Sequence, residues 1–135
     1  MVHVFRPLPV ERLKLLVFDL DGTLIDSAQD LCNSVNAALG QFGRGPLPDP
    51  AIAGFVGNGA PLLMRRSLAM AGGIAPEEVD EGLLREAYAF FLQYYREHKL
   101  DFTYAYEGVL EALAALKDLH DAPGGLGRFG VPAQC

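Results

Sequence analysis

The chain has 135 residues, half of them apolar, which is enough for one ordinary domain with a core. Its net charge of −6 argues against nucleic acid or an anionic membrane as a partner. No apolar run approaches the roughly 20 residues of a membrane span, and Met1 to Lys14 hold no signal-peptide core, so we expect a cytoplasmic protein. The two cysteines, Cys32 and Cys135, lie far apart and indicate neither a disulfide framework nor a zinc site.

The N-terminal part of the sequence predicts a leader, a strand and a helix. Residues 1–12 hold prolines and mixed charges and predict an irregular leader. The apolar run from about Leu13 to Leu20 predicts a strand buried on both faces. Gly22 allows a sharp turn after this strand. Ser27-Ala28-Gln29-Asp30 has the pattern of a capping box and begins a helix that ends near Gly43.

The middle of the chain is predicted to be almost wholly helical. A short helix from Pro50 to Val56 is followed by a tight turn, Gly57-Asn58-Gly59. Pro61 stands in the first turn of the next helix, which runs to about Ala71. Pro76 opens a long helix to about Lys99, with acidic residues near its N-terminus and basic residues near its C-terminus.

The C-terminal part of the sequence predicts one more helix and then loses its pattern. Apolar spacing indicates an amphipathic helix from Gly108 to about His120. Residues 121–135 hold four glycines and two prolines and show neither helical nor strand periodicity. We therefore expect an aberrant or disordered tail there. It is either a natural flexible end or an out-of-frame reading of the gene.

Two carboxylates, Asp19 and Asp21, follow the apolar run at the carboxyl end of the predicted strand, where catalytic residues of buried parallel strands lie. Two like charges this close favour a cation between them, and Mg²⁺ is the natural one because it prefers oxygen ligands. One Asp can then attack phosphorus, while the other protonates the leaving alkoxide and later activates water. Thr23 and its neighbouring backbone amides are candidates to hold phosphate oxygens.

The segment from Asp19 to Ser27 resembles motif one of the haloacid dehalogenase (HAD) superfamily, Asp-x-Asp-Gly-Thr-Leu-x-Asp-Ser. The resemblance implies that Asp19 is the nucleophile and Asp21 the general acid/base. It also implies that the Asp19 side chain and the Asp21 backbone carbonyl bind magnesium. The second Asp is typical of the phosphatases and is absent from the dehalogenase branch. The implied fold class is α/β, a HAD-like Rossmannoid core with a helical cap. This chain would hold mostly helices and one recognisable core strand of that fold.

The same resemblance divides the chain into parts. Residues 13–27 are similar to the first strand and catalytic loop of the HAD core. Residues 28–104 are similar to the helical cap that many HAD phosphatases insert after motif one. Residues 105–120 are similar to a core helix that follows the cap.

Two further segments look like the bacterial phosphoglycolate phosphatase branch. Residues 55–66 carry its Val-Gly-Asn-Gly-Ala pattern, and residues 104–109 its return to the core, with Glu107 where that branch has proline. The Gly57-Asn58-Gly59 turn is accordingly a candidate substrate-binding element, with an ordinary helix–helix connection as the alternative. Arg65, with the arginine after it, either attracts an anionic substrate or is a solvated helix charge.

The leading hypothesis is a magnesium-dependent phosphomonoester hydrolase. It would act on phosphoglycolate or a similar small phosphorylated substrate through an aspartyl-phosphate. The resemblance covers roughly residues 13–120, the first half of a full HAD phosphatase. The family's phosphate-binding Ser or Thr, its lysine and its later acidic motif are not found, so we expect a truncated and inactive chain. The alternatives are a non-catalytic helical interaction module and a HAD phosphosugar mutase, and the oligomeric state is left open.

Overall fold

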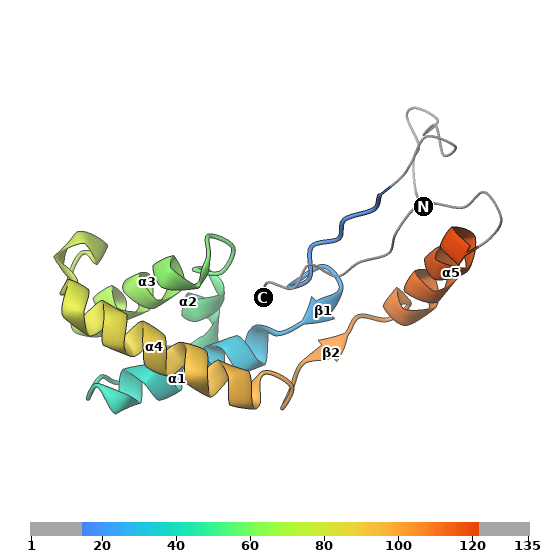
Figure 1. Cartoon of the computed structure of the whole chain (residues 1–135). Coiled ribbons are helices and arrows are strands. Elements are labelled where there is room, and N and C mark those ends of the chain that lie inside the picture. The colour runs from blue at the N-terminus through green and yellow to red at the C-terminus, as the bar shows by residue number, and fades with distance from the viewer. Residues whose placement is uncertain (1–14, 122–135) are drawn as a thin grey trace. The chain divides into compact units, whose positions relative to one another are not determined.

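The computed structural model describes residues 15–121, with side chains to residue 118, and the chain divides into two units. The first, called here the acidic-turn unit, comprises residues 1–24 and 105–135. The second, called the helical unit, comprises residues 25–104 (Figure 1). The predicted leader at residues 1–12 and almost all of the predicted tail lie outside the described residues.

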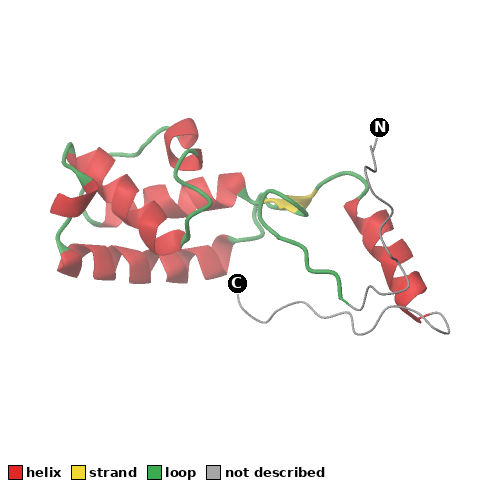
Figure 2. Cartoon of the chain, turned by 90° about the horizontal axis from the view of Figure 1, so that it is seen from above, coloured by secondary structure: helices red, strands yellow, loops and turns green. Residues whose placement is uncertain are grey.

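The helical unit contains four α-helices and one 3₁₀ turn (Figure 2). The elements are, in chain order, α1 (Ala28–Gln41), α2 (Asp49–Ala53), α3 (Ala60–Gly72), the 3₁₀ turn (Pro76–Glu78) and α4 (Glu81–His98). The predicted helices are confirmed in number and order, although α2 is shorter than expected.

The core of the helical unit lies between α1, α3 and α4. Helix α1 packs most extensively against α4, and α3 packs against both (Figure 1). The apolar positions at helical spacing are the buried ones, including Leu39 of α1, Met64 of α3 and Phe91 of α4. Ile52 brings α2 onto the same cluster. The helical unit therefore has a core of its own.

One predicted helix start was wrong, and another was right in its position but not in its capping bond. The long helix does not begin at Pro76, because the Asp80 side chain caps a separate start by accepting a hydrogen bond from Leu83 N at 2.8 Å. Residues 76–78 instead form the 3₁₀ turn. Ser27 is the N-cap of α1, but its side chain makes no capping hydrogen bond. Asp26 Oδ1 accepts a hydrogen bond from Ala28 N at 3.1 Å instead.

The buried strand predicted for Leu13 to Leu20 is not formed over residues 15–20, where the chain is extended (Figure 1). The apolar side chains of residues 15–18 are exposed, and Val17 is 75% exposed. A strand needs a neighbour to satisfy its backbone, and the described residues provide none for this segment. The sheet of the described chain has two short strands, β1 (Ile25–Asp26) and β2 (Tyr104–Ala105), which the sequence did not indicate.

The described C-terminal part of the acidic-turn unit is helix α5 (Val109–Asp121), as its apolar spacing predicts. Leu110 on this helix is 69% exposed. Among the helices within residues 15–121, none has the length and apolar character needed to cross a membrane.

Candidate active site

The turn that follows the extended segment brings the motif residues together. Leu20 O accepts hydrogen bonds from Thr23 N at 3.3 Å and from Leu24 N at 2.9 Å, which folds the chain back on itself. Gly22 has a φ of +76° inside this turn, a conformation that a residue with a β-carbon rarely adopts. Local backbone bonds therefore fold the turn, and Tyr106 N pairs with Leu24 O at its end at 3.1 Å.

Within this turn, the Thr23 hydroxyl faces the Asp19 carboxylate. Thr23 Oγ1 donates a hydrogen bond to Asp19 Oδ2 at 3.4 Å, a weak contact because such bonds are usually about 2.5–3.0 Å long. Asp21 lies between them in sequence, and all three side chains are exposed. The structure thus places the predicted nucleophile, the predicted acid/base and the predicted phosphate-binding hydroxyl on one exposed turn.

The oxygen atoms of this turn suit a hard cation. Carboxylate, carbonyl and hydroxyl oxygens are the ligands that Mg²⁺ takes, and Mg²⁺ commonly keeps several waters. Asp19 and Asp21 would fill only part of an octahedral shell. Within residues 15–121, no group of three or more His, Cys, Asp or Glu side chains is arranged to hold a metal. The turn therefore offers the type of ligand atom that magnesium prefers, but only some of the ligands that its shell needs.

The predicted substrate-binding turn, Gly57-Asn58-Gly59, belongs to the helical unit, and the two units are described separately. Its three residues are exposed and connect α2 to α3. Gly57 has a φ of +115°, and Gly59, the N-cap of α3, has a φ of +87°. This geometry suits a connection between helices and also leaves backbone groups open to solvent, so both predicted roles stay open.

Arg65 is engaged in holding the helical unit together. Its guanidinium pairs with Glu81 Oε1 at 2.6 Å and donates to Pro76 O at 3.3 Å. These contacts tie α3 to the 3₁₀ turn and to the start of α4. These contacts match neither of the two predicted roles: Arg65 is a structural, ion-paired residue and not a solvated helix charge, and its guanidinium is already engaged by Glu81.

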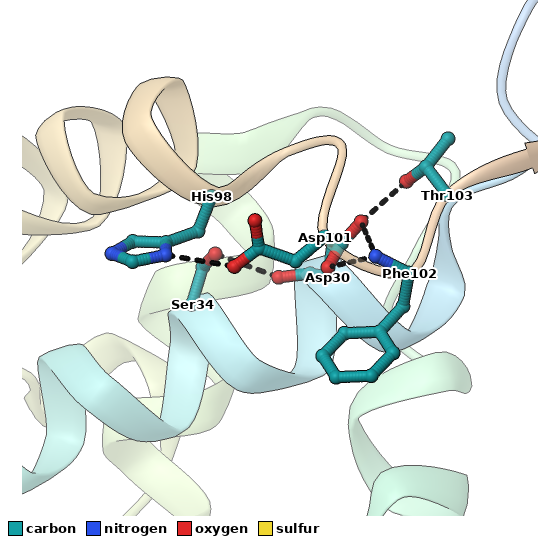
Figure 3. Close-up of polar contacts among 6 residues, drawn as sticks. All are labelled: Asp30, Ser34, His98, Asp101, Phe102 and Thr103. Carbon is teal, nitrogen blue, oxygen red and sulfur yellow. Dashed lines mark hydrogen bonds and ion pairs between the residues drawn. The ribbon is translucent and has the colours of Figure 1, made fainter.

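Asp30 is the polar residue that sequence reasoning missed. Its carboxylate, only 1% exposed, accepts hydrogen bonds from Phe102 N and Thr103 Oγ1 (Figure 3). A signal for its burial exists in the sequence, because Asp30, Ser34 and Ala38 follow at intervals of four residues on one face of α1. That face also carries the core residues of the helix, and all three positions are buried.

In the sequence an Asp-x-Asp-Gly-Thr turn is followed by an α-helical unit, and comparison with known proteins gives the family. The family model described as haloacid dehalogenase-like hydrolase matches residues 16–122. The chain therefore belongs to the haloacid dehalogenase-like hydrolase family, as the resemblance of its first motif predicted.

Its curated relatives include proteins named phosphoglycolate phosphatase. The one from Pseudomonas putida is 46% identical over 105 residues, which cover 77% of this chain and 37% of the relative. The one from Chromobacterium violaceum is 39% identical over 110 residues, which cover 82% of this chain and 48% of the relative. The chain thus spans less than half of the length of these relatives.

Solved structures show the same fold. A crystal structure described as a predicted phosphoglycolate phosphatase from Haemophilus somnus matches with a TM-score of 0.71 and 35% identity, over 78% of this chain and 47% of that one. A second, from Lactobacillus delbrueckii, matches with a TM-score of 0.65 and 25% identity, over 73% and 47% of the two chains. The predicted fold class, an α/β HAD-like fold represented here mostly by helices, is thereby confirmed.

Proposed function

We propose that the chain carries the nucleophile and acid/base of a magnesium-dependent phosphomonoester hydrolase. The observation that carries the proposal is the turn in which the Thr23 hydroxyl meets the Asp19 carboxylate at 3.4 Å, with Asp21 exposed beside them. Its relatives are named phosphoglycolate phosphatases, which supports a small phosphate ester such as phosphoglycolate as substrate. The cytoplasmic location expected from the sequence is part of the same proposal.

In the proposed reaction, a carboxylate oxygen of Asp19 attacks phosphorus and forms an aspartyl-phosphate. The bond from phosphorus to the ester oxygen breaks, and the leaving alkoxide takes a proton from Asp21. Asp21 then removes a proton from a water molecule, which attacks phosphorus and releases phosphate and free Asp19. Magnesium, when bound, offsets the negative charge of the phosphate and of the carboxylates.

Thr23 has a positioning role in this proposal. Its hydroxyl lies 3.4 Å from Asp19 Oδ2, where it would orient the carboxylate for the attack on phosphorus. The nearby backbone amides of the turn are available to phosphate oxygens. The Gly57-Asn58-Gly59 turn is proposed as a substrate contact carried by the helical unit. Residues 15–121 alone supply few magnesium ligands, and we propose that they have little activity by themselves.

The test compares two proteins. One is the 135-residue chain, and the other is a hybrid in which residues 15–120 replace the matching segment of the Pseudomonas putida relative. We expect the hybrid to hydrolyse phosphoglycolate only with Mg²⁺ present and the chain alone to stay near background. A hybrid that folds, as judged by circular dichroism, but hydrolyses no phosphate ester would contradict the proposed chemistry. Magnesium-dependent turnover by the chain alone would contradict the proposal that residues 15–121 have little activity by themselves.

A non-catalytic interaction module is the second candidate function. The observation in its favour is that α1, α3 and α4 enclose a core of their own, with Leu39, Met64 and Phe91 buried. A folded helical unit in the 135-residue chain, together with an inactive hybrid, is the result that would favour it.

A further inference from the structure

The carboxylate of Asp30 lies in the helical unit where two distant segments meet. Asp30 stands in the first turn of α1, and its partners are more than seventy residues away in sequence (Figure 3). Phe102 N donates to Oδ1 at 3.2 Å and to Oδ2 at 3.1 Å, and Thr103 Oγ1 donates to Oδ2 at 2.6 Å. The side chain thus attaches the segment that leaves α4 to the start of α1.

A second tie lies next to the first. Tyr104 Oη donates a hydrogen bond to Asp26 Oδ2 at 3.1 Å. Asp26 ends strand β1 just before α1, and Tyr104 begins strand β2 just after Thr103. Asp26 and Asp30 therefore hold three consecutive residues of the outgoing segment, 102–104.

Asp30 is unusual among the residues that hold this unit together. A carboxylate in a core is costly unless its oxygens accept hydrogen bonds, and here both do. No buried side-chain nitrogen or oxygen of the described residues lacks a partner. Hydrogen bonds to a charged oxygen are stronger than neutral ones, and they require the donors to hold a fixed direction. An apolar residue here would add to the core without fixing Phe102 and Thr103.

The segment between α4 and Thr103 has another contact, which involves different groups. His98 Nδ1 lies 2.8 Å from Asp101 Oδ2, and the His98 ring stacks on Tyr94 with centroids 4.2 Å apart. Both members of the His98–Asp101 pair are largely exposed, so this contact contributes little by itself. It supplies a matched position for a control, because Asp101 is adjacent to Phe102 in sequence and carries the same side chain as Asp30.

We propose that Asp30 is a clasp that fixes the outgoing segment, residues 102–103, to the incoming start of α1. The chain segment that enters the helical unit at residues 25–30 and the segment that leaves it at residues 102–104 are then held to each other and do not move independently. The clasp is a conformational device of the helical unit and does not depend on the proposed hydrolysis.

The test is amide hydrogen exchange followed by NMR on the full 135-residue chain and its Asp30→Asn variant. The substitution keeps the size of the side chain and removes its charge and one acceptor. We expect the Phe102 amide to exchange about 10- to 100-fold faster and its proton resonance to move upfield. The Phe91 amide in α4 should keep its protection.

Two further variants make the result decisive. Asp101→Asn removes the same charge from the neighbouring residue and should leave the Phe102 amide as in the parent chain. Thr103→Val removes one donor at nearly constant size, and it serves if Asp30→Asn does not fold. In Thr103→Val the amide of residue 102 should also exchange faster than in the parent chain, but by a smaller factor than in Asp30→Asn. Unchanged exchange at Phe102, or equal acceleration at Phe102 and Phe91, would overturn the proposal.

Discussion

The helical unit and the extended segment before the acidic turn treat similar apolar residues in opposite ways. In the helical unit, Leu39 and Phe91 are buried, whereas in the extended segment Val17 is 75% exposed and Phe18 39% exposed. A helix satisfies its own backbone and needs only one packed face, and α1, α3 and α4 provide that for one another. A strand must first find a neighbour for its backbone. An apolar run therefore predicts burial only where its partners are present.

The chemistry of the acidic turn depends less on such partners. The contact between Asp19 and Thr23 spans four residues, and the backbone bonds that shape the turn converge on Leu20 O. Short-range bonds of this kind depend on a few neighbouring residues of the chain. A site therefore has two requirements, which these regions illustrate. Some reactive groups are arranged by local bonds, and the other groups of the site must be supplied by the rest of the fold.

The largest expected effect concerns the nucleophile. In the hybrid enzyme, Asp19→Asn should abolish turnover and phosphoenzyme formation, because an amide cannot attack phosphorus as a carboxylate does. Asp21→Asn should lower turnover by roughly 10²- to 10⁴-fold, the usual contribution of general acid–base catalysis. Steady-state kinetics and trapping of the phosphoenzyme measure both effects.

The control for this experiment is Asp118→Asn on α5, which removes the same charge from an exposed site and should leave turnover unchanged. The helical unit should keep its circular dichroism in all three variants, since none of these residues belongs to it. Near-normal activity of the Asp19→Asn hybrid would show that the nucleophile is misassigned.

The next effect compares one phenylalanine from each region. Phe91 is 1% exposed and stacks on Tyr95 with centroids 5.9 Å apart, so Phe91→Ala should lower the free energy of unfolding by about 3–5 kcal/mol. Phe18→Ala removes the same side chain from a partly exposed position and should change it by about 0.5 kcal/mol or less. Urea unfolding followed by circular dichroism checks the pair. Equal losses would mean that the extended segment is as well packed as the core.

Much of the helical unit could be predicted from the sequence. The 3.6-residue period of apolar positions identified α1, α3, α4 and α5, because it depends on each helix alone. Their starts were harder to predict, since Asp80 and Pro76 compete as starting points and only the side-chain hydrogen bond of Asp80 decides between them. The apolar period also could not show that the buried Asp30 carboxylate accepts hydrogen bonds from Phe102 N and Thr103 Oγ1.

The candidate site was predictable in its residues and not in its surroundings. The spacing of Asp19, Asp21 and Thr23 predicts a chemistry, which stays a prediction, and the turn places the Thr23 hydroxyl 3.4 Å from the Asp19 carboxylate. The strand that precedes them was predicted from its apolar content, yet its formation depends on neighbours that no local pattern encodes. The partners of Asp30 are likewise distant in sequence, and only the fold brings Phe102 to it.

A smaller effect is expected from the one thiol buried in the described residues. Burial, with a lesser contribution from the charge of Asp49, raises the pKa of the Cys32 thiol from 9.0 to about 11. Because the folded state then holds this proton more tightly than the unfolded state, stability should fall as the pH rises from about 9 to 11. The loss attributable to the thiol should reach about 1–2 kcal/mol, less than the full shift would give because solvent screens part of the effect.

The measurement is the free energy of unfolding as a function of pH, compared between the parent chain and Cys32→Ala. Tyrosines and lysines also titrate in this range, so only the difference between the two proteins reports the thiol. Both proteins should carry Cys135→Ser, so that Cys32 is the one thiol present. Parallel pH profiles for the two proteins would contradict a raised pKa.

The smallest effect contrasts a left-handed glycine in each region. Gly73, with a φ of +65°, ends α3, and Gly73→Ala should lower the free energy of unfolding by about 1 kcal/mol, because a β-carbon is strained there. Gly22 has a φ of +76°, so an alanine there would be strained to a similar degree, but this residue lies in the acidic turn. Gly22→Ala should therefore leave the unfolding of the helical unit unchanged and lower only the turnover of the hybrid.

Gly40→Ala in α1 is the matched control: its added carbon meets open space, and it should stabilise the helix by about 0.5–1 kcal/mol. Equal destabilisation by Gly22→Ala and Gly73→Ala in urea would show that the acidic turn and the helical unit unfold as one body.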